Sequence, residues 1–178
     1  MPVFLSQEEL EAEEKDLEKF RGKLFRSEYL PQVKSFPQVR ELFQRLLADG
    51  WKLALASSAK GKDLATYKKI AHIDDLLDAE TSSDDAEKSK PHPDIFQAAM
   101  ERLGNISARD CIVVGDSPYD AEAASKAGIR YVGFLCGGFA EPDLRKAGYE
   151  TLYQGATDLL ANYDSSIFHN EKPDSPNS

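Results

Sequence analysis

Several features that would identify other classes of protein are scarce in this 178-residue chain. No apolar stretch approaches the ~20 residues that a membrane-spanning helix needs. Residues 1–5 are too short for a signal peptide and lack its basic flank. Lys and Arg number 22 against 31 Asp and Glu, and the net charge of −9 argues against sequence-independent binding to nucleic acid. We therefore expect a cytoplasmic protein that engages neither a membrane nor nucleic acid.

Cysteine is also rare, with Cys111 and Cys136 as the only two. Both lie in apolar, strand-like stretches of the sequence. We interpret them as small core side chains in a reducing compartment, in preference to a disulfide or a metal-binding pair. With 41% hydrophobic residues, the chain can bury one core of ordinary size and has little left for a second one.

One long helix is predicted for the start of the chain. Ser6 and Glu9 have the spacing of a capping box at its first turn. Apolar residues recur on one stripe of this helix up to about residue 29, namely Leu10, Leu17, Phe20 and Leu24. The dense acidic run at 8–18 is interpreted as a solvated face; a site for a basic partner is the alternative.

From residue 38 onward, helical and strand-like segments alternate. Helices are predicted at 38–48, 62–71, 93–103, 119–127, 142–147 and 157–161, and strands at 51–56, 78–81, 111–115, 131–135 and 150–153. Strands separated by helices imply a parallel sheet with right-handed crossovers, and therefore an α/β fold. Pro37 suits the first turn of the first of these helices. The polar composition beyond Tyr163 predicts a disordered tail at 164–178.

Two acids follow the apolar strand that ends at Gly115. Open α/β folds bind ligands at this carboxyl edge of the sheet. Mg²⁺ prefers one or two carboxylates together with waters and phosphate oxygens, so Asp116 is a candidate metal ligand. Asp120, within the first turn of the next helix, is placed to reach the ion through water or to orient a basic side chain. The alternative is that both acids only cap that helix.

Two other segments carry groups that can bind phosphate: serine hydroxyls in one and a lysine ammonium in the other. Ser57 and Ser58 close the strand at 51–56, where a hydroxyl and the amides of the next turn form a pocket for a phosphoryl oxygen; Ser-Ser is also common in ordinary loops. Lys90 lies in Ser-Lys-Pro-His-Pro-Asp at 89–94, whose prolines stiffen the loop. A fixed cation there stabilises charge that develops in phosphoryl transfer. We interpret His92 as a loop-surface residue and not as a general base.

Together these segments resemble a known family. Leu-Ala-Ser-Ser at 55–58, Ser-Lys-Pro-His-Pro-Asp at 89–94 and Gly-Asp-Ser-x-x-Asp at 115–120 resemble, in order and spacing, the second, third and fourth motifs of the haloacid dehalogenase-like (HAD) phosphohydrolases. The resemblance extends over about 36–163 and is typical of the branch with phosphoglycolate phosphatases and β-phosphoglucomutases.

The resemblance implies specific roles for these residues. Ser57, Ser58 and Lys90 would bind the phosphoryl group, with Lys90 also the catalytic residue that this chain retains. Asp116 would ligate Mg²⁺, and Asp120 would support the metal or Lys90. The implied substrate is a small phosphorylated metabolite, because the family hydrolyses or transfers phosphoryl groups.

The first motif of the family, Asp-x-Asp-x-Thr, has no match before Ser57. In the family its first aspartate attacks phosphorus to form an aspartyl-phosphate, and the second acts as general acid and base. The resemblance therefore implies a HAD-like Rossmannoid parallel sheet with flanking helices and a missing first strand. It assigns 36–163 to this core and 1–35 to the remnant of a helical cap. We expect an N-terminally truncated phosphatase or phosphomutase that is inactive as given; the alternative is a catalytically dead phosphate-binding or interaction protein.

The missing strand has a structural consequence. In the family it lies centrally, between the strands that end at Ser57 and at Asp116, so its loss leaves two inner strands without a hydrogen-bonding neighbour. Either the two strands close up against each other, or another chain fills the slot, or a segment preceding residue 1 in a longer protein does so.

Overall fold

The computed structural model describes residues 7–171 and residue 173. The chain divides into two compact units, Met1–Lys34 and Ser35–Ser178. In the first, α1 (Gln7–Leu24) continues into a π-helical turn (Phe25–Tyr29) and a 3₁₀ turn (Leu30–Gln32). The predicted long helix is therefore present, although Ser6 of the predicted capping box lies outside the described residues. Leu17 and Phe20 on its apolar stripe are exposed to 58% and 63%.

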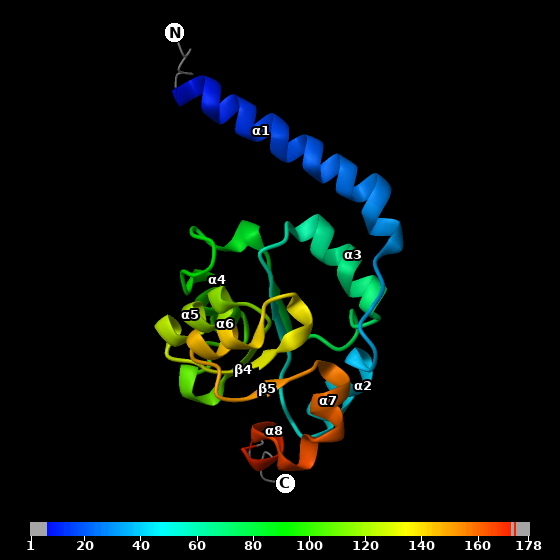
Figure 1. Cartoon of the computed structure of the whole chain (residues 1–178). Helices are drawn as coiled ribbons and strands as arrows, with labels where there is room; N and C mark the ends of the chain where they lie inside the picture. The colour runs from blue at the N-terminus through cyan, green and yellow to red at the C-terminus, as the bar shows by residue number, and fades with distance from the viewer. Residues whose placement is uncertain (1–6, 172, 174–178) are drawn as a thin grey trace. The chain divides into compact units, whose positions relative to one another are not determined.

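The second unit alternates helices and strands, as the sequence pattern predicts (Figure 1). Its elements are α2 (Val39–Ala48), β1 (Ala54–Ala56), α3 (Gly61–Ala71), β2 (Ala79–Thr81), α4 (Asp94–Arg102), β3 (Ile112–Gly115), α5 (Pro118–Ala127), β4 (Arg130–Phe134), α6 (Glu141–Lys146), β5 (Leu152–Tyr153), α7 (Ala156–Ala161) and α8 (Ile167–Asn170). Gly128 ends α5 in the left-handed conformation that glycine adopts without strain. The α/β fold class is confirmed.

All strand pairs are parallel, but the strands form two separate sheets. β1 pairs with β2, which aligns Ala54 with Ala79. β3 pairs with β4 and β4 with β5, which aligns Ile112 with Arg130 and Gly133 with Leu152. Within the described part of the chain, β1 and β3 do not pair with each other. The two inner strands have therefore not closed up.

Two layers of helices cover the strands. One buried cluster joins α2, α7 and the C-terminal turn to one face of the strands; its members include Leu42, Leu46, Val132, Leu159 and Phe168. A second cluster joins α4 and α5 to the other face; its members include Ile95, Phe96, Ala123, Ala124 and Ile129. This three-layer arrangement brings the carboxyl ends of β1 and β3 to one edge of the unit.

The C-terminal segment differs from its prediction. Residues 164–171, predicted to be disordered, fold as the end of a 3₁₀ turn (Tyr163–Ser165) and as α8. Phe168 is only 4% exposed and meets the Trp51 ring edge-on, with ring centroids 5.9 Å apart. Trp51 Nε1 also donates a hydrogen bond to the Phe168 carbonyl at 3.0 Å. Within a polar sequence, the buried Phe168 and the buried Ser166, whose Oγ donates to the Tyr163 carbonyl at 2.6 Å, anchor this segment.

The start of α2 also differs by one or two residues. Gln38 is its N-cap and has a left-handed backbone, with φ of 58°, so that the helix begins at Val39. Pro37 therefore precedes the helix and does not lie in its first turn.

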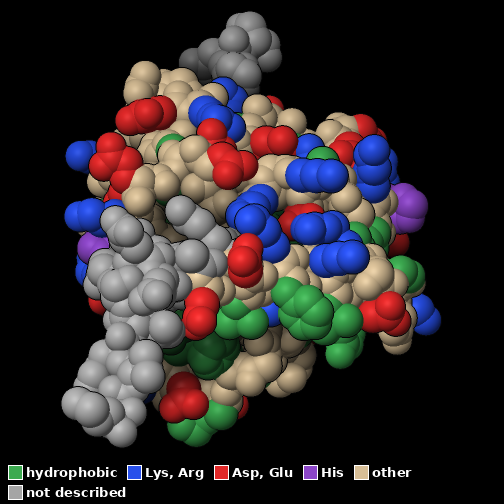
Figure 2. Space-filling model, turned by 90° about the horizontal axis from the view of Figure 1, so that it is seen from above, with side chains coloured by type: hydrophobic (Ala, Val, Ile, Leu, Met, Phe, Trp, Pro, Cys, Tyr) green, Lys and Arg blue, Asp and Glu red, His purple; other side chains and the backbone are tan. Residues whose placement is uncertain are grey.

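The visible surface is mixed in charge. On the face shown in Figure 2, acidic and basic side chains are interspersed. Among the described residues, no helix has the length and apolar character needed to cross a membrane. Cys111 and Cys136 are free thiols, both half-buried.

Candidate active site

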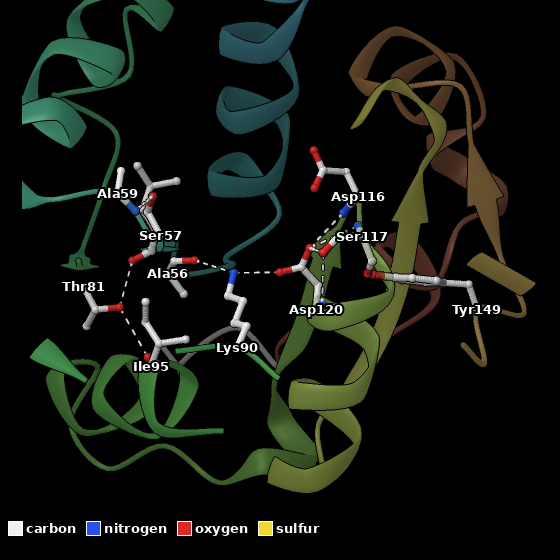
Figure 3. Close-up of polar contacts among 11 residues, drawn as sticks. Ala56, Ser57, Ala59, Thr81, Lys90, Ile95, Asp116, Ser117, Asp120 and Tyr149 are labelled. Atoms are coloured by element: carbon white, nitrogen blue, oxygen red, sulfur yellow. Dashed lines mark hydrogen bonds and ion pairs between the residues drawn. The ribbon is translucent and has the colours of Figure 1, made fainter. Parts of the chain in front are cut away.

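Lys90 lies at the centre of the carboxyl edge (Figure 3). Its Nζ donates to the carbonyl oxygen of Ala56, the last residue of β1, at 3.0 Å. The same Nζ pairs with Asp120 Oδ1 at 2.7 Å, and the Phe96 ring lies beneath it at 5.1 Å. The Lys90 side chain is only 15% exposed, so it is not a solvated surface lysine. One ammonium group thus connects the end of β1 with the start of α5.

Asp120 is the anion that holds Lys90. Its Oδ2 accepts hydrogen bonds from Ser117 Oγ at 2.6 Å, from Ser117 N at 3.1 Å and from Asp116 N at 3.3 Å. Ser117 Oγ in turn accepts from Asp120 N, which completes a capping box at α5. Burial alone would raise the pKa of Asp120, but the charge and hydrogen bond of Lys90, together with Ser117, lower it below its usual range. Asp120 is therefore ionised and engaged through both oxygens.

Asp116 is placed differently from Asp120. It directly follows β3, and its side chain is exposed and points away from the Lys90–Asp120 pair in Figure 3. Partial burial and the neighbouring negative charge of Asp120 raise the pKa of Asp116, while Lys90 opposes this effect. Among the described residues, Asp116 takes part in no salt bridge of the site. It is the carboxylate that remains available to a ligand.

These donors fit Mg²⁺ only in part. In the part of the chain that the structure describes, no three His, Cys, Asp or Glu side chains gather as a metal-binding group. Asp116 can provide the single carboxylate that Mg²⁺ accepts when waters and phosphate oxygens complete its shell. Both oxygens of Asp120 are already occupied by hydrogen bonds, so Asp120 fits the role of positioning Lys90 better than that of a direct ligand.

Ser57 and Ser58 lie at the end of β1, across from Asp116. Ser57 Oγ accepts a hydrogen bond from Ala59 N at 3.1 Å, which leaves its hydroxyl proton free to donate. Ser58 is exposed. The amide of Gly61, at the start of α3, donates to Asp84 Oδ2 at 3.1 Å. The predicted cradle of free amides is thus partly filled by the protein's own side chains, and the Ser57 hydroxyl remains its most available donor.

His92 is exposed on the loop that carries Lys90, and its amide donates to the Ser89 carbonyl at 3.1 Å. The same loop is tied to α5, because Lys126 Nζ donates to the Pro91 carbonyl at 3.0 Å. The loop therefore has its own anchor, separate from the Lys90 ammonium.

The sequence analysis named Gly115 as part of a motif, but it missed two residues that shape the site, Gly137 and Tyr149. A Cβ on Gly115 would lie 2.5 Å from both Asp120 Cβ and Tyr149 Oη, and a Cβ on Gly137 would lie 2.5 Å from Asp116 Cβ. Tyr149 is 2% exposed, and its hydroxyl donates to the Ser117 carbonyl at 3.0 Å. Burial and the negative charges of Asp120 and Asp116 raise the pKa of Tyr149 well above its usual value. The glycine in Gly-Asp-Ser was the only advance signal of this close packing.

A sequence model described as haloacid dehalogenase-like hydrolase matches residues 3–134, about three quarters of the chain. This chain belongs to the haloacid dehalogenase-like hydrolases. A phosphoglycolate phosphatase from Escherichia coli is 30% identical over 142 residues, which cover 80% of this chain and 55% of that protein. A HAD-like hydrolase domain protein from Arabidopsis thaliana is 37% identical over 103 residues, covering 56% of this chain and 32% of that protein. The chain thus spans about a third to a half of these curated relatives.

Solved structures agree with this family. A hydrolase from Pseudomonas syringae superposes with a TM-score of 0.75 at 26% identity, covering 92% of this chain and 74% of that one. A protein assigned as a β-phosphoglucomutase from Thermotoga maritima gives 0.70 at 25% identity, covering 93% and 73%. The chain is therefore a HAD-like hydrolase of the phosphoglycolate phosphatase and β-phosphoglucomutase branch, and the predicted family is confirmed.

Proposed function

We propose that this chain forms the phosphate- and metal-binding part of a Mg²⁺-dependent phosphatase or phosphomutase for small phosphorylated metabolites. One observation carries the proposal: the Lys90 ammonium bridges the strand end that bears Ser57 and the helix start next to Asp116. Three segments separated in sequence therefore converge on one buried cation. The names of the relatives, a phosphoglycolate phosphatase and a β-phosphoglucomutase, support phosphorylated metabolites as the substrate class.

Each retained residue has a role in this proposal. Lys90 is the cation that attracts the phosphoryl oxygens and stabilises the charge that develops on them. The Ser57 hydroxyl donates to one of these oxygens. Asp120 and the Ala56 carbonyl hold the Lys90 ammonium in place, so that no reorganisation of the cation is needed during the reaction. Mg²⁺, bound at Asp116 and the phosphate, would neutralise negative charge on the phosphoryl group.

The nucleophile is the part that this chain lacks in our proposal. No Asp-x-Asp pair precedes Ser57, and Ser57 has no base beside it in sequence that would turn it into a substitute nucleophile. We propose that a further polypeptide segment supplies the attacking carboxylate, and that residues 1–178 alone do not turn over substrate. We also propose that 1–35 is what this chain has of a helical cap and that 36–163 is its core. The unpaired Cys111 and Cys136 support a reducing, cytoplasmic setting.

The test is to titrate residues 1–178 with Mg²⁺ and with inorganic phosphate and to monitor binding by NMR. We expect Mg²⁺ to bind weakly, with a dissociation constant of about 1 mM or above, because the protein supplies one carboxylate and waters fill most of the other coordination positions. Asp116→Asn should abolish this binding, and Lys90→Met should abolish phosphate binding. Lys126→Met is the matched control, because it removes a cation of α5 that contacts the Lys90 loop at the Pro91 carbonyl but lies outside the site. Tight Mg²⁺ binding that survives Asp116→Asn would contradict the assignment.

A further inference from the structure

α1 is one continuous helix (Figure 1), and its apolar stripe is exposed. Leu17 and Phe20 are 58% and 63% exposed, and Leu24, the last residue of the helix, is 40% exposed. They are three and four positions apart, which places them on one side of the helix. This is also the spacing of the a and d positions that form the seam between two helices of a coiled coil. α1 therefore has one half of a helix–helix seam.

α1 by itself is a marginal helix. Helices of this length are barely stable in water, and most of those in proteins are stabilised by packing of an apolar face. Gly22, inside the helix, costs about 1 kcal/mol relative to Ala. The ion pair of Asp16 with Lys19 joins side chains that are 77% and 79% exposed, so it adds little. All side chains of α1 that the structure describes are exposed. A partner that covers the stripe would therefore stabilise α1 directly.

The charges along this segment divide into two halves. Seven of the eleven residues at 8–18 are acidic and one is basic, whereas 19–26 hold four basic residues and no acid. The boundary falls between Leu17 and Phe20, near the middle of the apolar stripe. A second copy of the chain, antiparallel across this point, would place each acidic half beside a basic half. A twofold interface needs such self-complementarity, because each of its contacts occurs twice.

An antiparallel pair centred at this boundary has a defined register. Residues equally distant from the centre on opposite sides face each other, so Leu17 meets Phe20 of the second copy, and Phe20 meets its Leu17. Asp16 and Lys23 are both exposed and flank the stripe on the same side. In this register Asp16 of each copy lies near Lys23 of the other. The seam thus joins two apolar contacts with two pairs of opposite charges.

A parallel pair fits the same helix less well. Glu13 is exposed and lies one heptad before Phe20, hence on the line of the seam. In a parallel pair, Glu13 would face Glu13 of the second copy, and the two acidic halves would lie side by side. Like charges at this separation repel each other. In the antiparallel pair, Glu13 instead faces Leu24 within the basic half.

We propose that two copies of this chain associate through α1 as an antiparallel pair, with Leu17 against Phe20 and Asp16 beside Lys23. A basic partner protein would match residues 8–18 but would meet like charge at 19–26. A second copy satisfies both halves and the apolar stripe together. The seam is short, so the dimer is weak and forms at high protein concentration. Pairing needs neither Mg²⁺ nor phosphate, so its failure would leave the proposed function untouched.

The test is sedimentation equilibrium of purified residues 1–178 from about 5 µM to about 500 µM, a range that covers weak interfaces. The mass should rise from that of the 19.8 kDa monomer towards twice this value. Phe20→Lys, which places a charge in the seam, should weaken association at least about a hundredfold. Phe139→Lys is the matched control, because Phe139 is also exposed, at 38%, but lies outside α1. It should associate like wild type.

Charge reversal tests the orientation. Lys23→Glu should weaken the dimer about tenfold, because two attractive pairs with Asp16 become repulsive. The double variant Asp16→Lys with Lys23→Glu exchanges the charges of each pair and should restore the affinity to within about threefold of wild type. In a parallel pair, residue 16 would instead lie beside Arg21 of the second copy, so the double variant would stay weak. Rescue is therefore specific to the antiparallel pair.

Three results would overturn the proposal. The first is a wild-type mass that stays monomeric over the whole range; a loss of stability in Phe20→Lys would then show that α1 packs against its own chain. The second is equal association of Phe20→Lys and wild type, which would place the interface elsewhere. The third is a double variant that associates no better than Lys23→Glu. Circular dichroism melts of all variants show whether the second unit stays folded, and if Phe20→Lys unfolds it, Lys23→Glu and its rescue decide the question.

Discussion

The buried Lys90–Asp120 pair gives a quantitative test of the site. Lys90→Met keeps most of the aliphatic stem and its contact with Phe96, but it removes the partner of Asp120 Oδ1 and of the Ala56 carbonyl. Because the two side chains are only 15% and 10% exposed, water cannot easily replace the ammonium. Removing one partner of a buried pair costs about 3–5 kcal/mol, which corresponds to a fall in Tm on the order of 10 °C for a domain of this size.

The assay is urea unfolding, followed by circular dichroism, of wild type, Lys90→Met and a control. Lys126→Met is that control: Lys126 is 43% exposed and, among the described residues, bonds to Glu122 and the Pro91 carbonyl, so this change should cost less than about 1 kcal/mol. Adding Asp120→Leu to Lys90→Met should restore at least about 1 kcal/mol, because the stranded charge is removed. If Lys90→Met lowered the free energy of unfolding by less than about 1 kcal/mol, as the control does, the claim that Asp120 and the Ala56 carbonyl hold a buried Lys90 ammonium would be refuted.

Three further predictions concern packing and pH. Gly115→Ala should destabilise the protein by about 1–3 kcal/mol in urea unfolding, since the new Cβ would lie 2.5 Å from Asp120 and Tyr149, whereas Gly61→Ala, with 3.4 Å to its nearest atom, should be close to neutral. Phe168→Ala should cost about 3 kcal/mol and shift Trp51 fluorescence; a neutral change would mean that residues 164–171 do not anchor on the core. Asp120 has a lowered pKa in the folded state, so its contribution to stability is complete above about pH 5 and is lost as pH falls below its unfolded value near 3.9. The stability difference between wild type and Asp120→Asn should therefore shrink below about pH 4, and a difference that grows there would reverse the assigned sign.

The repeating part of the fold followed from the sequence because apolar periodicity and turn residues agree with each other. Gly128 after a helical pattern, and the apolar run that ends at Gly115, fixed α5 and β3 to within about one residue of their observed bounds. The C-terminal turn did not follow from the sequence, because the residues that anchor it, Phe168 and Ser166, stand singly in a polar stretch and a composition window averages them away. Gln38 was missed for a similar reason: a left-handed cap in a residue other than glycine leaves no signal in the sequence.

The site was predictable as a set of residues but not as a network. Motif spacing placed Ser57 and Asp116 at strand ends and Lys90 on the proline-stiffened loop at 89–94, and parallel strands bring such strand ends to one edge. Sequence alone left Asp120 between two roles, as a metal support or as a partner of Lys90. The hydrogen bonds of both its oxygens favour the second role. Tyr149 lies close to Gly115, and Gly137 lies close to Asp116. Both approaches depend on loops whose course no local sequence pattern specifies.

The most direct test of the account is turnover of p-nitrophenyl phosphate with Mg²⁺ by residues 1–178, with and without a fused apolar strand that ends in Asp-x-Asp-x-Thr. The account predicts background rates for the chain alone, because a positioned cation without an attacking group contributes little. It predicts Mg²⁺-dependent turnover for the fusion, lost in its Lys90→Ala variant and also when the first aspartate of the strand is replaced by asparagine. Robust Mg²⁺-dependent turnover by residues 1–178 alone, abolished by Lys90→Ala, would contradict it and place the nucleophile within this chain.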